Sequence, residues 1–124
     1  MKILVVDDHP NLARITALAL RTLGCATVTA HTTTVARCLL AEQKFDGVFL
    51  DVNLGAESGM EFLSELRTTD AAPPVIVFTA QDREEVALEA HRRGALGCLI
   101  KPYVLDDVRA LLELLAAHRG ASSP

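Results

Sequence analysis

Carboxylate, hydroxyl and amine side chains stand directly after short apolar runs of this sequence. Asp7 and Asp8 follow residues 3–6, Asp51 follows residues 48–50, Thr79 follows residues 75–78, and Lys101 follows residues 98–100. If they meet in one crevice, the carboxylates repel one another, at roughly 4 kcal/mol for two charges about 4 Å apart in an effective dielectric of about 20. Lys101 offers one compensating charge, and oxygen ligands suit a hard divalent ion, which we expect to be Mg²⁺ because it tolerates several waters. A carboxylate, a metal ion, a lysine and a hydroxyl are the parts that phosphoryl transfer needs, so the residues predict this chemistry.

Five apolar runs alternate with amphipathic stretches, which is typical of βα units that build a parallel sheet. The runs are residues 3–6, 27–30, 48–50, 75–78 and 98–100. We therefore predict an α/β fold, a doubly wound five-stranded parallel sheet in the order 2-1-3-4-5 with five helices on both faces. In such a sheet, ligands bind at the carboxyl ends of the strands where the strand order reverses, here between strands one and three. Asp7 and Asp8 should then face Asp51.

The composition of the runs predicts their places in the sheet. Residues 3–6, 48–50 and 75–78 have no polar alternation, as expected of central strands that helices cover on both faces. Residues 26–30 alternate small and polar side chains around one valine. This pattern predicts an edge strand.

Each predicted helix has an apolar stripe to bury. The inward residues are expected to be Leu12, Ile15, Ala19 and Leu23 in the first helix, Val35, Leu39 and Leu40 in the second, Met60, Leu63 and Leu66 in the third, and Val108, Leu111, Leu112 and Leu115 in the fifth. The second helix should span residues 34–43 and the fourth residues 83–93, and Gly24 and Gly94 should end the first and fourth helices. Ser58 and Glu61 have the spacing of a capping box. Residues 1–119 are predicted to form one domain, and residues 120–124 a flexible tail or the start of a linker.

Composition argues against several classes of function. The chain has 124 residues, a formal net charge of -4 and a pI near 5.5, so we expect no direct nucleic acid binding by this domain. The apolar runs are far shorter than the roughly 20 residues of a membrane span, and no signal peptide is recognised, so no membrane association is expected. Cys25, Cys38 and Cys98 lack metal-binding spacing, which predicts reduced, mostly buried thiols in a cytoplasmic protein.

His9 directly follows the acid pair and is the imidazole nearest to it in the sequence. It could be a metal ligand or a base, or a residue of the capping loop or the surface, and we favour the second interpretation. His31, His91 and His118 are interpreted as solvated.

Four motifs occur in order along the chain: VVDDHP at residues 5–10, FLDVNL at 49–54, VFTA at 77–80 and LIKP at 99–102. Through them nearly the whole chain resembles the receiver domain of two-component response regulators, whose fold is flavodoxin-like. The resemblance implies that Asp51 is the phosphorylated residue and a ligand of Mg²⁺. It also implies that Asp8 ligates the ion directly, that Asp7 helps through water, and that the carbonyl of Asn53 completes the protein ligands.

Further roles follow from the same resemblance. Thr79 should hydrogen-bond the phosphoryl group, Lys101 should pair with it, and Lys101–Pro102 should be a cis peptide. Gly59 stands where such domains usually have glycine, which implies a role in loop geometry. Two positions depart from the family pattern: Gly55 replaces a frequent proline, and Cys98 replaces the Tyr or Phe that most receivers use as a switch residue.

The function implied by the resemblance is that of a conformational switch. The domain would take a phosphoryl group from a sensor histidine kinase or phosphotransfer protein in a Mg²⁺-dependent reaction. It would not be an enzyme, apart from assisting its own phosphorylation and dephosphorylation. The resemblance allows a homodimer through the face of the fourth helix, fifth strand and fifth helix. It identifies neither the cognate kinase nor the downstream effector.

Two alternatives remain open at this point. One is a pseudo-receiver that binds a partner without phosphorylation, which is disfavoured because the whole phosphorylation set is present in the sequence. The other is a small Mg²⁺-dependent phosphohydrolase with Asp51 as its nucleophile. Such an enzyme would need a substrate pocket, for which 124 residues leave little chain.

Overall fold

The computed structural model describes residues 1–54, 57–69, 72–79, 84–100 and 103–122, without the side chains of residues 57 and 119–122. Gly55, Lys101 and Pro102 lie outside this part of the chain, as do residue 80 of the third motif, residue 83 of the predicted fourth helix and residues 123–124 of the predicted tail. No helix within the described ranges combines the length and the apolar character needed to cross a bilayer.

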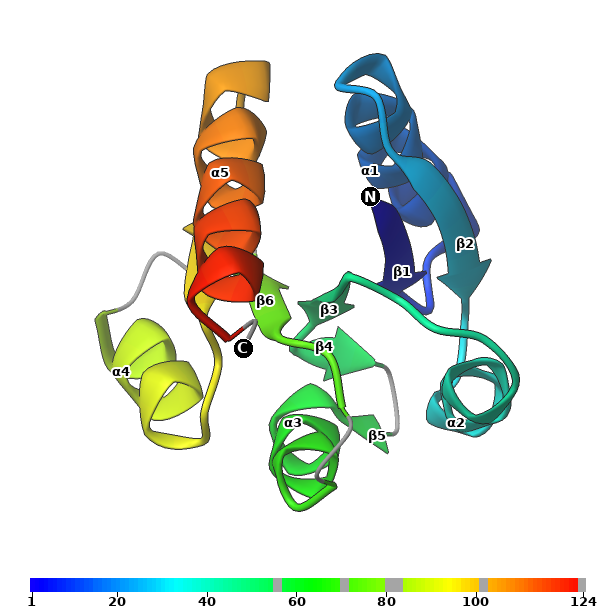
Figure 1. The fold of residues 1–124 in the computed structure, drawn as a ribbon. Coiled ribbons are helices and arrows are strands. Elements are labelled where there is room, and N and C mark those ends of the chain that lie inside the picture. Colours follow the sequence, from blue (N-terminus) through cyan, green and yellow to red (C-terminus); the bar gives the residue numbers. More distant parts are fainter. Residues whose placement is uncertain (55–56, 70–71, 80–83, 101–102, 123–124) are drawn as a thin grey trace.

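Five parallel strands form the central sheet (Figure 1). They are β1 (Lys2–Val6), β2 (Ala26–Ala30), β3 (Gly47–Asp51), β6 (Val75–Thr79) and β7 (Gly97–Ile100). Their order, β2-β1-β3-β6-β7, confirms the predicted order 2-1-3-4-5, because β6 and β7 are the fourth and fifth strands of this sheet. The predicted edge position of β2 is confirmed as well, and β3 and β6 are buried along their whole length.

Five helices cover the two faces of the sheet, as predicted. They are α1 (Pro10–Thr22), α2 (Thr33–Glu42), α3 (Gly59–Arg67), α4 (Glu84–Arg92) and α5 (Leu105–Ser122). Helices α2, α3 and α4 pack on one face and α1 and α5 on the other (Figure 1). Alternate residues of a strand therefore enter different cores: Leu4 and Val6 of β1 face α2 and α3, whereas Ile3 and Val5 face α1 and α5.

The predicted inward stripes are confirmed for α3 and α5, whereas in the first helix the prediction is wrong for Leu12 and Ile15 and confirmed for Leu23, which packs against the core. Leu63 and Leu66 of α3 and Val108, Leu112 and Leu115 of α5 are buried, with Met60 and Leu111 packed against them. In α1 the buried residues are Ala13, Thr16, Ala17 and Leu20. Leu12 and Ile15 are 39% and 58% exposed. Small side chains line the inner face of α1 because they let the helix approach the sheet closely, and the larger aliphatic side chains are left outside.

The same rule explains α2. Val35 is exposed and Ala36 is buried, so the predicted inward position of Val35 is wrong, whereas Leu39 and Leu40 pack against the core as expected. Cys38, on the outer side of this helix, is exposed, which corrects the prediction of mostly buried thiols. Cys25 is buried and Cys98 is half-buried, and all three cysteines are free.

The helix ends follow the sequence signals. Gly24 and Gly94 follow α1 and α4 with φ angles of 93° and 101°, a region that glycine enters without steric cost. Ser58 caps α3 by accepting a hydrogen bond from the Glu61 N–H, as its spacing predicts. Helix α5 runs on to Ser122, so the first residues of the predicted tail are helical, while the domain division at residue 119 stays a prediction.

Candidate functional site

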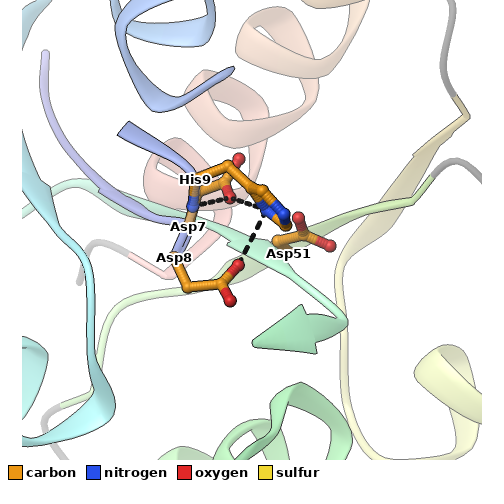
Figure 2. Close-up of side chains that lie close together, drawn as sticks. All are labelled: Asp7, Asp8, His9 and Asp51. Atoms are coloured by element: carbon orange, nitrogen blue, oxygen red, sulfur yellow. Dashed lines mark hydrogen bonds and ion pairs between the residues drawn. The ribbon is translucent and has the colours of Figure 1, made fainter. Parts of the chain in front are cut away.

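The carboxyl ends of β1 and β3 bring the predicted acidic residues together. Val6 pairs with Leu50 in the register of these neighbouring strands, so the next residues along, Asp7 and Asp51, lie side by side. Asp7 is 0% exposed and Asp51 is 4% exposed, while the Asp8 side chain is 26% exposed. One ligand atom from each of Asp7, Asp8, His9 and Asp51 lies within 4.8 Å of all the others (Figure 2). We call these four residues the acid cluster.

Backbone N–H groups orient two of the carboxylates in the same way. Asp7 Oδ1 accepts a hydrogen bond from the N–H of His9 at 2.9 Å, and Asp51 Oδ1 accepts one from the N–H of Asn53 at 2.9 Å. Each carboxylate thus closes a turn onto the residue two positions ahead. The other oxygen of Asp7, Oδ2, is buried and has no hydrogen-bond partner within the described part of the chain. A buried carboxylate oxygen without a partner is costly unless a cation meets it.

This arrangement fits Mg²⁺. Ligand atoms on opposite sides of the ion are about 4.2 Å apart when each bond is about 2.1 Å long. The ligand atoms of the acid cluster are spread over no more than 4.8 Å, so small side-chain movements bring carboxylate oxygens to bonding distance. Asp7, Asp8 and Asp51 are therefore the side chains that could hold the ion.

A short hairpin that the sequence analysis missed supports the segment after Asp51. Strands β4 (Asn53–Leu54) and β5 (Glu57–Ser58) pair in antiparallel fashion and lead into α3. Gly59 donates its N–H to the Val52 carbonyl at 3.1 Å. A Cβ atom added at Gly59 would lie 2.6 Å from Val52 Cα and even closer to the carbonyl oxygen of Asp51. The absence of a side chain at Gly59 thus lets the start of α3 lie against the backbone of Asp51 and Val52, which agrees with the expected role in loop geometry.

Comparison with known proteins identifies the family of the chain. The sequence profile described as the response regulator receiver domain matches residues 3–113. The chain belongs to this family. Transcriptional regulatory protein ZraR of Escherichia coli K12 is 38% identical to this receiver over 116 residues, which are 94% of this chain and 26% of that protein. The receiver therefore spans about a quarter of the length of the curated relatives that it matches.

Two solved structures similar to this receiver hold ligands. Response regulator TrrA from Thermotoga maritima, in complex with Mg²⁺ and BeF, superposes with a TM-score of 0.81 at 26% identity, covering 92% of this chain and 97% of that chain. A response regulator from Burkholderia pseudomallei with a phosphorylated aspartic acid, a calcium ion and citrate has a TM-score of 0.80 at 27% identity. In that case 99% of this chain and 75% of the other are covered.

The remaining predicted site residues of the receiver lie at the same edge of the sheet or outside the described residues. Thr79 ends β6 and is 1% exposed, one residue beyond the Phe78 that pairs with Asp51. Ile100 pairs with Thr79 at the end of β7, directly before Lys101, but Lys101 and the Lys101–Pro102 peptide lie outside the described residues. Asn53 is exposed, and its N–H is committed to Asp51.

Tyr103, two residues after Lys101, is a site neighbour that the motifs did not reveal. Its hydroxyl lies 2.6 Å from the Thr16 hydroxyl of α1, so it ties the segment before α5 to the helix that follows the acid pair. Burial raises the pKa of Tyr103; the bond to Thr16 acts against this shift, and the negative charge of Asp7 adds to it. No sequence signal marks this residue, because the recognised motif ends at Pro102.

Tyr103 should resist ionisation in the folded receiver. Because the pKa of Tyr103 is raised in the folded state, the neutral phenol contributes its full stabilisation at pH values below 10.0, the ordinary pKa of tyrosine. That stabilisation is lost as the pH rises through the raised pKa. The chain has one tyrosine and no tryptophan, so phenolate absorbance reports this group alone. We expect a titration midpoint above 10.0 in the native protein and one near the ordinary value in urea. Thr16→Val should move the native midpoint further up, and a native midpoint at or below the urea value would contradict this account.

Cys98 of β7 lines a recess beside α4. The recess has a volume of about 140 Å³ and is lined by Ala87, Ala90, His91, Ala95, Gly97 and Cys98. Burial raises the pKa of the Cys98 thiol, so the thiol form is favoured. Because alanine and glycine make up most of the lining, space is left open beside Cys98.

Proposed function

We propose that this receiver accepts a phosphoryl group on Asp51 from a phosphohistidine of a sensor histidine kinase or phosphotransfer protein, in a Mg²⁺-dependent reaction. The observation that carries the proposal is the acid cluster, in which the buried Asp51 carboxylate lies beside Asp7, whose Oδ2 has no hydrogen-bond partner among the residues that the structure describes. The family and the phosphorylated aspartic acid in the Burkholderia pseudomallei relative support it.

The proposed reaction moves one phosphoryl group between two side chains. The Asn53 N–H holds the Asp51 carboxylate through Oδ1, and Oδ2 is the proposed nucleophile. As the new O–P bond forms, the P–N bond to the donor histidine breaks and its electron pair returns to the imidazole. Mg²⁺, when held by Asp7, Asp8, Asp51 and the Asn53 carbonyl, would neutralise charge on the phosphoryl oxygens. Thr79 and Lys101 are proposed to bind those oxygens.

The output is proposed to be a change of conformation rather than catalysis on a substrate. A phosphoryl group at Asp51 would bind Thr79 and Lys101 and so favour one conformation of the ends of β6 and β7 over another. The receiver is acidic, with a net charge of -4, so we propose that it acts on a protein effector or domain and not by binding DNA itself. Its three free cysteines support a place in the reducing cytoplasm. The face of α4, β7 and α5 is the proposed surface for a homodimer.

Phosphorylation from a small donor tests this function. We expect acetyl phosphate with Mg²⁺ to add one phosphoryl group to the intact protein by mass spectrometry, and EDTA to prevent the addition because the carboxylates then stay uncompensated. Absence of labelling under every condition would favour a pseudo-receiver. Repeated turnover of p-nitrophenyl phosphate would favour a phosphohydrolase.

A further inference from the structure

The imidazole of His9 lies against the carboxylates of the acid cluster. Its Nδ1 atom is 2.8 Å from Asp8 Oδ1 and 3.4 Å from Asp7 Oδ1. Figure 2 shows the ring turned towards the carboxylates, with Asp51 close beside it. His9 occupies the N-cap position of α1, but its side chain makes no capping hydrogen bond. The ring is therefore not committed to the helix that His9 begins.

The ring contacts one oxygen of each of the first two carboxylates. Asp8 Oδ1 is buried, and the contact that the described residues give it is with His9 Nδ1 at 2.8 Å. Asp7 Oδ2, on a wholly buried side chain, has no donor among the described residues. The Asp7 and Asp8 oxygens within 3.4 Å of an imidazole nitrogen form a mixed nitrogen and oxygen ligand set with it. Their spread of at most 4.8 Å is close to the roughly 4.2 Å that separates opposite ligands of a small divalent ion.

We propose that His9 is a ligand of this cation site and shifts its preference from Mg²⁺ towards Zn²⁺ and its spectroscopic substitute Co²⁺. The inference rests on the proposed function, since it uses the same acid cluster. Mg²⁺ is held almost wholly by oxygen, whereas imidazole suits the later first-row transition ions, whose affinity for nitrogen-containing sites is higher. Zn²⁺ would thus compete with Mg²⁺ at the site of phosphorylation.

A simpler explanation is that the imidazole only balances the negative charge of Asp7 and Asp8. Charge balance and ligation have opposite consequences for a substitution. If His9 balances charge, its removal should leave the affinity for every divalent ion unchanged or make it higher, because a competitor for the carboxylates is lost. If His9 is a ligand, its removal should weaken Zn²⁺ and Co²⁺ binding while leaving Mg²⁺ binding unchanged or tighter.

Titration calorimetry of the whole chain with Mg²⁺, Zn²⁺ and Co²⁺, at one fixed and mildly alkaline pH, separates these cases. The variant His9→Asn should fold, because asparagine is a favoured N-cap residue. We expect its Zn²⁺ and Co²⁺ affinities to fall at least about tenfold, as is typical when a metal site loses a supporting group. The visible absorption bands of bound Co²⁺ should change in the same variant. His91→Asn, which removes an exposed imidazole from α4, is the matched control and should bind all three ions as the wild type does.

Three other outcomes of this titration would contradict the role of His9 as a ligand. Unchanged Co²⁺ affinity and spectrum in His9→Asn, with Mg²⁺ still bound by the wild type, would overturn the role of His9 and leave the proposed function standing. An equal loss in His91→Asn would assign the binding to surface imidazoles and also overturn it. If no divalent ion bound the wild type, Mg²⁺ included, the metal site of the proposed function would fail as well.

Discussion

Asp51→Asn is expected to abolish phosphoryl labelling by acetyl phosphate, with an initial rate lowered by at least about two orders of magnitude, because an amide oxygen is a poor nucleophile. The variant should stay folded, since the asparagine Oδ1 can still accept the Asn53 N–H that Asp51 Oδ1 accepts at 2.9 Å. Intact-mass measurement over time, with Mg²⁺ in excess, checks the result.

Asp46→Asn provides the matched control for this experiment. Asp46 precedes β3 and accepts the Lys2 N–H at 2.7 Å, whereas Asp51 ends the same strand. The control thus removes one carboxylate from the opposite edge of the sheet and should be labelled at the wild-type rate. Labelling of Asp51→Asn at that rate would assign the acceptor to another residue.

Asp7→Asn is expected to make the domain more stable in EDTA, by about 1–2 kcal/mol in the free energy of unfolding. The Asp7 carboxylate is wholly buried, and none of the described residues donates a hydrogen bond to its Oδ2. An asparagine keeps the Oδ1 acceptor used by the His9 N–H, removes one charge from a repelling group and places an amide donor near the remaining carboxylates. Asp7 would thus lower the free energy of unfolding of the metal-free domain because it keeps a cation site preformed.

The same variant should lose the stabilisation that Mg²⁺ gives. At Mg²⁺ ten times its dissociation constant, wild type should gain about 1.4 kcal/mol and Asp7→Asn much less. Urea unfolding with EDTA and with Mg²⁺ measures both effects. Asp106→Asn is the control: its carboxylate is 84% exposed and pairs with Arg109 on α5, so its loss should matter by less than about 0.5 kcal/mol. Lower stability of Asp7→Asn in EDTA would contradict the repulsion account.

The sheet and the acid cluster could be predicted because both depend on short patterns. Continuous apolar runs mark buried parallel strands, and polar residues directly after them must share one edge of the sheet. The sequence therefore predicts that Asp7, Asp8 and Asp51 lie together, and in the structure their ligand atoms lie within 4.8 Å of each other.

The inward face of α1 could not be predicted from hydrophobicity. Large apolar side chains rank highest on that criterion, but here Ala13 and Ala17 are buried while Ile15 and Leu18 are each 58% exposed. The distance between helix and sheet decides this, and distance is a tertiary property. For the same reason the bond between Tyr103 and Thr16, 87 residues apart in the sequence, left no local pattern to recognise.

We expect the recess beside Cys98 to make the balance between the proposed conformations of the receiver sensitive to hydrostatic pressure. Its roughly 140 Å³ lies between α4 and β7, on the face where a receiver's two conformations are proposed to differ. Pressure favours whichever arrangement occupies less space, because empty volume in a packed protein is eliminated first. If one conformation closes the recess and the other keeps it open, compression would shift the population towards the closed form without any change in phosphorylation. A chain that filled this position with an aromatic ring would have less volume to lose there.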